Sequence, residues 1–376
     1  MPKEKTATLV LKDGTRIEGK SFGADTPCAG EVVFNTGMMG YPESMTDPSY
    51  QGQILAFTYP LIGNYGIGGE CKSSDNISKR FESNKIQVKG IIVSEYSENY
   101  SHWDAKKSLA DWLKKQNIPA ITGIDTRKLT QKIREHGTII GKIVTEKEDP
   151  EYYDPDTENQ VDKVSIKKPK LYKRGTKKII CIDCGMKNNI LRSLLSRNLT
   201  VNRVPWDYDF IEAGEKFDGI FITNGPGDPA HLEPLINIIK KTLKLKKPIF
   251  GICMGAQILA LASGAKTYKL KFGHRSQNQP CIDVETGHCY ITSQNHGFAI
   301  REKSLKPGWK TWLKNANDNT VEGIKHKTLP YMACQFHPEA TPGPTDTDHF
   351  FDTFARFMDL INLRRNNSQR KRGRFK

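Results

Sequence analysis

The sequence has no long hydrophobic run and no sign of a leader segment. Its 376 residues are 37% hydrophobic, and no apolar stretch approaches the ~18 residues that a membrane-spanning helix needs. The N-terminus is short, carries an acid at Glu4 and leads directly into a strand-like run, so neither a signal peptide nor a transit peptide fits. We therefore expect a cytoplasmic protein with no membrane partner.

Cysteines are few and lack the close spacing of secreted disulfide-rich proteins. The eight cysteines are scattered along the chain, which indicates a reducing compartment. Cys181 and Cys184 form a Cys-x-x-Cys pair inside a strand-like run, and no second pair completes a tetrahedral zinc site. Cys334 and His337 could supply a second pair of zinc ligands, but His337 would then be unavailable as a general base, the role considered for it below. We expect no metal site.

The net charge of +15 is not spread evenly over the chain. Residues 166–178 and 362–376 each hold seven Lys or Arg and no acid, so the remainder is nearly neutral. We interpret 146–176 as a linker and 362–376 as a flexible basic tail. Solvated charge runs are favoured over nucleic-acid binding, although an RNA-binding role that depends on these two segments stays open.

The strongest chemical signal is Cys253, which lies where a short apolar strand meets a helix-forming run. Residues 249–252 are apolar and residues 254–262 are good helix formers. Gly251 and Gly255 remove side chains that would clash in so sharp a turn, as in a nucleophile elbow. A helix N-terminus favours a thiolate and presents N–H groups to an oxyanion. The alternative is a buried structural cysteine.

The best candidate for a general base is His337, which follows another apolar stretch. In extended chain, His337 and Glu339 project to the same side, so Glu339 can orient the imidazole while its other nitrogen takes the proton of Cys253. A surface His-Pro turn is the alternative. His296 competes as the base, but no carboxylate follows it.

The chain divides into two α/β regions. Residues 1–145 predict a mixed α/β domain with a hairpin at 6–19 and helices at 105–115 and 126–135. From residue 177 to residue 361, strand-like and helical runs alternate, which predicts a doubly wound, mostly parallel sheet with active groups at the carboxyl ends of its strands. A closing helix is expected at 346–361.

Three elements in this order resemble the class I glutamine amidotransferases: the glycine-rich residues 224–229, Gly-x-Cys-x-Gly-x-Gln at 251–257, and His-Pro-Glu at 337–339. Residues 36–50, 58–66 and 123–127 then resemble the amino-terminal domain of carbamoyl-phosphate synthase small chains. The resemblance covers residues 6 to 360, nearly the whole chain.

The resemblance implies that Cys253 attacks the side-chain amide of L-glutamine, with His337 as base and Glu339 orienting it. Backbone N–H groups near Met254 and Gly227 would stabilise the oxyanion. The positions that match the family's glutamine contacts are Ser49, Gly225, Gly227, Met254, Gln257, Asn295, Gly297 and Phe298. Ser49 would reach the pocket from the amino-terminal domain.

Small chains of this family form a heterodimer with a large chain, which uses ATP and Mg²⁺ to join their ammonia to bicarbonate. The present sequence has no Gly-x-x-x-x-Gly-Lys phosphate loop, so we expect no cofactor in this chain and the large chain as its partner. Residues 41–44, 100–103 and 278–281 look closer to eukaryotic forms, including fungal ones; arginine and pyrimidine synthesis both stay open.

Two departures and two alternatives accompany the resemblance. Ala256 stands where the family usually has a histidine, and Ser276-Gln277 replaces a more glycine-rich phrase. Retention of Cys253 argues against the ammonia-dependent branch, which has lost the nucleophile. A class I amidotransferase subunit of another biosynthetic enzyme would share the triad but lack residues 36–66, and a non-catalytic regulatory subunit would keep only the fold.

Overall fold

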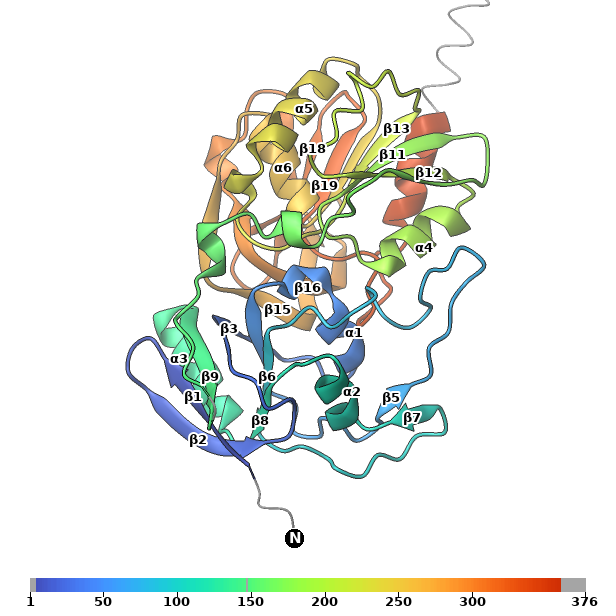
Figure 1. Cartoon of the computed structure of the whole chain (residues 1–376). Coiled ribbons are helices and arrows are strands. Elements are labelled where there is room, and N and C mark those ends of the chain that lie inside the picture. Colours follow the sequence, from blue (N-terminus) through green and yellow to red (C-terminus); the bar gives the residue numbers. More distant parts are fainter. Residues whose placement is uncertain (1–4, 147, 360–376) are drawn as a thin grey trace, which may run out of the picture.

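The amino-terminal domain is built on a closed barrel whose strands follow the order β1-β2-β8-β6-β4-β3-β9 (Figure 1). The computed structural model describes residues 5–146 and 148–359. The barrel strands are β1 (Thr6–Leu11), β2 (Arg16–Ser21), β3 (Cys28–Asn35), β4 (Gln53–Phe57), β6 (Gly90–Val93), β8 (Ala120–Thr122) and β9 (Ile139–Thr145). Around them lie α1 (Tyr41–Thr46), the short helix η1 (Pro48–Tyr50), α2 (Leu109–Lys115) and α3 (Thr126–His136).

Local sequence explains most of these boundaries. The expected hairpin is confirmed: β1 and β2 pair antiparallel, and Gly14 in the turn has φ +90°, which suits glycine. The α3 helix is also confirmed, with the side chain of Asp125 accepting from Lys128 N at 2.8 Å and Gly137 just past its end.

The helix expected at 105–115 was wrong in its first part. Residues Ala105–Lys107 form β7, which pairs with β5 (Ile67–Gly68). The helix begins after Ser108, because the Ser108 hydroxyl accepts a hydrogen bond from Asp111 N at 3.0 Å and so caps the first turn.

The second domain contains a sheet in the order β10-β12-β11-β13-β14-β19-β18-β16-β15-β17. Strands β12, β11, β13, β14 and β19 run parallel, and the pairings on either side of them are antiparallel. The bounds are β10 (Lys170–Tyr172), β11 (Lys178–Asp183), β12 (Thr200–Pro205), β13 (Gly219–Ile222), β14 (Ile249–Ile252), β15 (Thr267–Asp283), β16 (Cys289–Ile300), β17 (Trp309–Asn315), β18 (Val321–His326) and β19 (Tyr331–Cys334).

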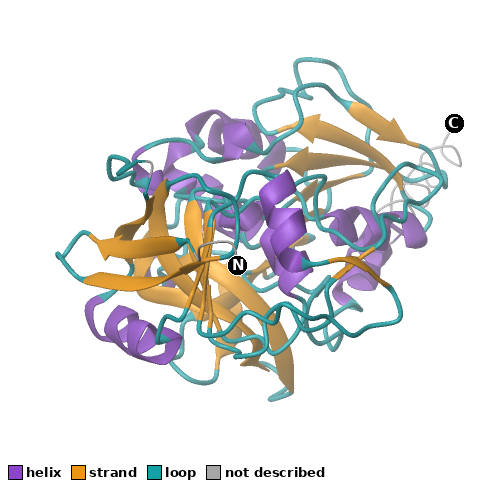
Figure 2. Ribbon diagram, turned by 60° about the horizontal axis from the view of Figure 1, so that its bottom comes forward, coloured by secondary structure: helices purple, strands orange, loops and turns teal. Residues whose placement is uncertain are grey.

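Helices cover both faces of the parallel strands, which confirms the doubly wound architecture (Figures 1 and 2). Alternate residues of β11 enter different cores: Ile180 and Ile182 pack with α5 (Glu233–Leu243) and α6 (Met254–Ala262), whereas Ile179 and Cys181 pack with α4 (Asn188–Ser196). Two further short helices, η4 (Pro229–His231) and η5 (Glu302–Ser304), lie in connections.

The closing helix starts later than expected. Residues 346–349 form a turn, and helix covers 350–359 of the described chain. Phe350, Phe351 and Phe354 are buried in the core shared with α4, as expected for an apolar face. The basic segment 362–376 lies outside the described residues. No helix among the described residues is long and apolar enough to cross a bilayer.

The segment 146–176, which we expected to be a linker, joins the two domains but is not loose chain. It contains the short helices η2 (Pro155–Thr157) and η3 (Val161–Lys163), and its last part forms β10 at the edge of the large sheet. Val161 is buried in the core of the second domain. The few buried apolar residues of this polar segment, among them Val161 and Tyr172, have no regular spacing from which the packing could be predicted.

Candidate active site

Cys253 lies at the junction of β14 and α6, in the backbone conformation that the sequence pattern indicates. It is the N-cap residue of α6 with φ 53° and ψ −104°, and it is 2% exposed. A positive φ at a residue with a side chain is strained, and such strain is typical of functional sites. The Cys253 N–H donates to Cys334 O of the neighbouring strand at 2.9 Å, which fixes the turn.

The two glycines beside Cys253 are required by close backbone contacts. A Cβ on Gly251 would lie 2.5 Å from Gly255 O, and a Cβ on Gly255 would lie 2.2 Å from Ile222 O in β13. Because both neighbours are backbone atoms, neither can move aside easily. The Gly-x-Cys-x-Gly pattern therefore lets α6 start directly against the sheet.

His337 is held by a carboxylate, as expected. Its Nδ1 lies 2.7 Å from Glu339 Oε1, and both side chains are buried. The backbone of His337 is fixed by a hydrogen bond from its N–H to Ser293 O at 2.9 Å. Among the described residues, Nε2 of His337 has no hydrogen-bond partner, which leaves this nitrogen free to exchange a proton.

A buried lysine extends this chain of charges. Lys187, at the N-terminus of α4, places Nζ 3.1 Å from Glu339 Oε1 and also donates to Ala340 O. Burial by itself would raise the pKa of Glu339, but Lys187 and His337 lower it to about 2. Glu339 is therefore an anion at neutral pH.

The same electrostatics act on His337. Burial would lower its pKa, but the Glu339 carboxylate and the Cys253 thiol together raise it above the usual histidine range. A positive imidazole beside a thiol stabilises the reactive thiolate. The arrangement can thus generate a nucleophile and later return a proton to a leaving group.

One pocket collects nearly all the candidate substrate contacts from both domains. Those lining it are Ser49, Gly225, Gly227, Cys253, Gln257, Asn295, Gly297 and Phe298. Gly225 is needed because a Cβ there would lie 2.1 Å from Cys184 O. Gln257 donates from Nε2 to Phe298 O at 3.0 Å, which ties α6 to β16 across the pocket.

Ser49 reaches this pocket from the amino-terminal domain. Asn224 Nδ2 donates to Ser49 Oγ at 2.9 Å, and Ser49 N donates to Asp47 Oδ1 at 2.9 Å. The other oxygen of Asp47 accepts from Asn295 Nδ2 at 3.2 Å. The bonds from Asn224 and Asn295 cross between the domains, so the pocket wall depends on their docking.

Two residues considered in the sequence analysis, Met254 as a substrate contact and His296 as a base, have side chains that do not lie as those roles require. Met254 does not line the pocket; its side chain is 1% exposed and packs in the core, which leaves only its backbone to face a ligand. His296 lines the pocket, but its Nδ1 lies 2.8 Å from Phe298 O and its Nε2 lies 3.1 Å from Gln294 Oε1. Burial, together with His274, lowers the pKa of His296 well below its usual value. The geometry favours His337 as the base.

Several residues of the site were missed by the sequence analysis, among them Lys187 beside Glu339 and three residues that line the pocket. Lys187 follows β11, so the rule that sites gather at strand carboxyl ends could have found it. Glu31, Asp156 and Lys269 line the Cys253 pocket, and Lys269 bridges Glu31 at 2.9 Å and Asp156. These three come from the barrel, the connecting segment and the large sheet, and no local sequence motif identifies them.

Two families match the chain in succession. Residues 9–143 match "Carbamoyl-phosphate synthase small chain, CPSase domain", and residues 180–357 match "Glutamine amidotransferase class-I". The two matches correspond to the barrel domain and the doubly wound domain described above.

Curated relatives match along nearly the whole chain. The chain is 50% identical to "Multifunctional protein CAD" of Squalus acanthias over 98% of its length and 47% identical to "Multifunctional protein URA2" of Saccharomyces cerevisiae over 93%. It is 48% identical to "Carbamoyl-phosphate synthase [ammonia], mitochondrial" of Homo sapiens over 94%. The chain spans only 17% of the first two proteins and 24% of the third. With both family matches in their expected order, the chain belongs to the carbamoyl-phosphate synthase small chains, whose second domain is a class I glutamine amidotransferase.

Proposed function

We propose that this chain hydrolyses L-glutamine through a thioester on Cys253 and supplies the ammonia for carbamoyl phosphate synthesis. The observation that carries the proposal is the strained Cys253 at the helix N-terminus, which lines an interdomain pocket in the domain that also holds the buried His337–Glu339 pair.

The chemistry uses one set of groups twice. The Cys253 sulfur attacks the amide carbon of glutamine, and the imidazole of His337 carries the thiol proton to the leaving nitrogen, so ammonia departs and a thioester remains. Water, deprotonated by His337, then cleaves the thioester to glutamate and restores the thiol. N–H groups near Met254 and Gly227 stabilise the oxyanion; such a donor is typically worth ~3 kcal/mol.

A second cavity offers a route away from the nucleophile. It shares Asn295 with the Cys253 pocket and is also lined by His337, Asp47 and Lys187. Pro342 and Gln277 also line it, and Gln277 donates to the backbone of the exposed Met39 at 2.7 Å. Polar walls suit ammonia, and we propose that ammonia leaves this way toward an ATP- and Mg²⁺-dependent synthetase partner.

The partner is proposed from the names of the relatives, which are long multifunctional proteins and carbamoyl-phosphate synthases. The present chain covers a small part of each, and we assign the synthetase step to that partner and not to this chain. Arginine and pyrimidine synthesis both remain compatible destinations for the product.

The test is glutamate release by the purified chain. Cys253→Ser should abolish it and leave the thermal unfolding curve unchanged, whereas the exposed Cys289→Ser should behave as wild type. Glutamine should also protect Cys253, but not Cys289, from alkylation by iodoacetamide, read by mass spectrometry. Near-normal hydrolysis by Cys253→Ser would refute the mechanism.

The transfer of ammonia to the synthetase needs a separate assay. The chain should co-purify with a large ATP-dependent synthetase, and the mixture should form carbamoyl phosphate from glutamine, bicarbonate and ATP. A mixture that makes carbamoyl phosphate only from added ammonia would favour a regulatory role for this chain.

A further inference from the structure

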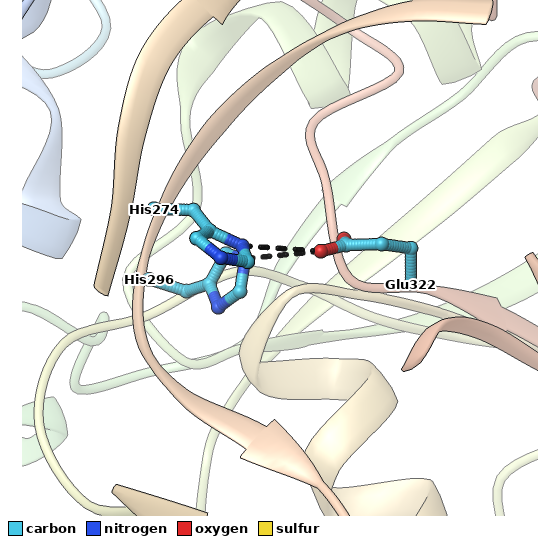
Figure 3. A group of neighbouring side chains, drawn as sticks. All are labelled: His274, His296 and Glu322. Atoms are coloured by element: carbon cyan, nitrogen blue, oxygen red, sulfur yellow. Dashed lines mark hydrogen bonds and ion pairs between the residues drawn. The ribbon is translucent and has the colours of Figure 1, made fainter. Parts of the chain in front are cut away.

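Two buried histidines and a buried glutamate meet in the antiparallel part of the large sheet (Figure 3). His274 lies on β15, His296 on β16 and Glu322 on β18, and they are 7%, 5% and 0% exposed. Both imidazoles point toward one carboxylate oxygen of Glu322, with His274 Nδ1 at 3.2 Å and His296 Nε2 at 3.8 Å (Figure 3). One ligand atom from each residue lies within 4.8 Å of the others.

The outer nitrogens of both histidines are already engaged. His274 Nε2 lies 2.8 Å from Asp318 Oδ2, and His296 Nδ1 lies 2.8 Å from Phe298 O. A proton on each outer nitrogen would leave each inner nitrogen with a lone pair that can bind a metal ion. Metal-binding histidines are commonly fixed in this way.

Gln294 offers a further oxygen beside His296. Gln294 Nε2 donates to Thr292 Oγ1 at 3.1 Å and to Cys281 Sγ at 3.3 Å, which turns the amide oxygen toward His296 Nε2 at 3.1 Å. The second oxygen of Glu322 is buried and has no hydrogen-bond partner among the described residues. The two inner nitrogens and the Glu322 carboxylate are therefore close enough together to act as three ligands of one buried cation.

We propose that His274, His296 and Glu322 bind a divalent transition metal of the Zn²⁺ class, with Gln294 Oε1 at the fourth position. Nitrogen and oxygen donors of this kind suit Zn²⁺, Co²⁺ and Ni²⁺. In a tetrahedral site with bonds of ~2.1 Å, ligand atoms lie ~3.4 Å apart, and the observed separations of 3.2 and 3.8 Å lie on either side of this value.

The ion would hold together the sheet that forms one wall of the Cys253 pocket. Strand β16 carries His296 between Asn295 and Gly297, both of which line that pocket. Coordination would pin β16 to β15 and β18 and so stiffen the wall. The role is structural, and the proposal holds whether or not the chain hydrolyses glutamine.

The test uses the full chain, stripped with a chelator and then titrated with ZnCl₂ or CoCl₂. Elemental analysis should find one bound ion per chain, and Zn²⁺ should raise the unfolding temperature by ~5 °C. Bound Co²⁺ should show d–d bands without sulfur-to-cobalt charge transfer, because no thiolate belongs to the site.

Matched variants locate the ion. His274→Asn and Glu322→Gln should lose the Zn²⁺-dependent shift, whereas the exposed His288→Asn should keep it. Cys253→Ser should also keep the shift, which separates this site from a thiolate site at the nucleophile. No stoichiometric uptake by folded wild type, a shift that survives Glu322→Gln, or a shift lost in Cys253→Ser would each overturn the proposal. The wild-type measurement decides even where a variant fails to fold.

Discussion

Substituting Glu339 by Gln tests two roles that the structure assigns to one carboxylate. Glu339 Oε1 accepts from His337 Nδ1 at 2.7 Å and lies 3.1 Å from Lys187 Nζ. Glutamine keeps the size and an acceptor oxygen but removes the negative charge. The change should therefore weaken both the orientation of the base and the neutralisation of a buried lysine.

The two losses have comparable magnitudes. Removing one partner of a buried ion pair typically costs about 3–5 kcal/mol of unfolding free energy. The pKa of Glu339, about 2 instead of its ordinary 4.5, corresponds to about 3 kcal/mol. Loss of a well-oriented general base should lower kcat for glutamate release by about 10²–10⁴-fold.

A second substitution separates these roles. In Lys187→Met combined with Glu339→Gln, no unpaired cation is left, and Glu82, which also interacts with Lys187, keeps its ion pair with Arg192 at 2.8 Å. Urea unfolding should show that stability recovers in the double variant, whereas kcat stays low because nothing negative orients His337.

The pH dependence gives an independent check. The pKa of Glu339 is lower in the folded chain than in the unfolded chain, so its contribution is complete above pH ~4.5 and is lost as pH falls toward 2. Wild type should lose more stability than Glu339→Gln over this interval. A stable Glu339→Gln variant with kcat within threefold of wild type would refute the orienting role, and recovery of kcat in the double variant would trace the rate loss to misfolding.

Three further predictions concern strain, transport and docking. In urea unfolding, Cys253→Gly should be at least as stable as Cys253→Ala, because glycine relieves ~1–3 kcal/mol of backbone strain at φ 53°. As a control, Ala260→Gly inside α6 should lower the free energy of unfolding by ~2 kcal/mol. Ser44→Leu, in the second cavity, should leave glutamate release intact but lower carbamoyl phosphate formation and release free ammonia; equal coupling would exclude this route. Arg192→Met removes the interdomain partner of Glu82 and should raise KM for glutamine more than it lowers kcat, since Ser49 moves with the barrel.

The sequence predicted what local chemistry determines. Alternating strands and helices predicted the doubly wound sheet, and the Gly-x-Cys-x-Gly pattern predicted the turn at Cys253, because both follow from backbone sterics within a few residues. The pairing of His337 with Glu339 was also predictable, since the two are separated by one residue.

Tertiary contacts decided the rest. The charge on Lys187 gives no hint that it is buried, because its partners Glu339 and Glu82 are distant in sequence. The packing of the connecting segment was not predictable for the same reason, because Val161 enters the core of the second domain and Asp156 lines the pocket through contacts distant in sequence. The cluster at His274, with members from three strands, has no sequence motif.

The location of the pocket explains why neither domain alone specifies it. The doubly wound sheet supplies Cys253, His337 and the glycine loop at the carboxyl ends of its strands, which is where this fold places reactive groups. The barrel supplies Ser49 and Asp47, held through Asn224 and Asn295. Because these hydrogen bonds form only when the domains dock, substrate binding and domain docking are linked. A shift of the barrel relative to the sheet domain should alter the affinity for the substrate. The nucleophile and its base both lie on the sheet domain, so such a shift leaves their mutual geometry unchanged.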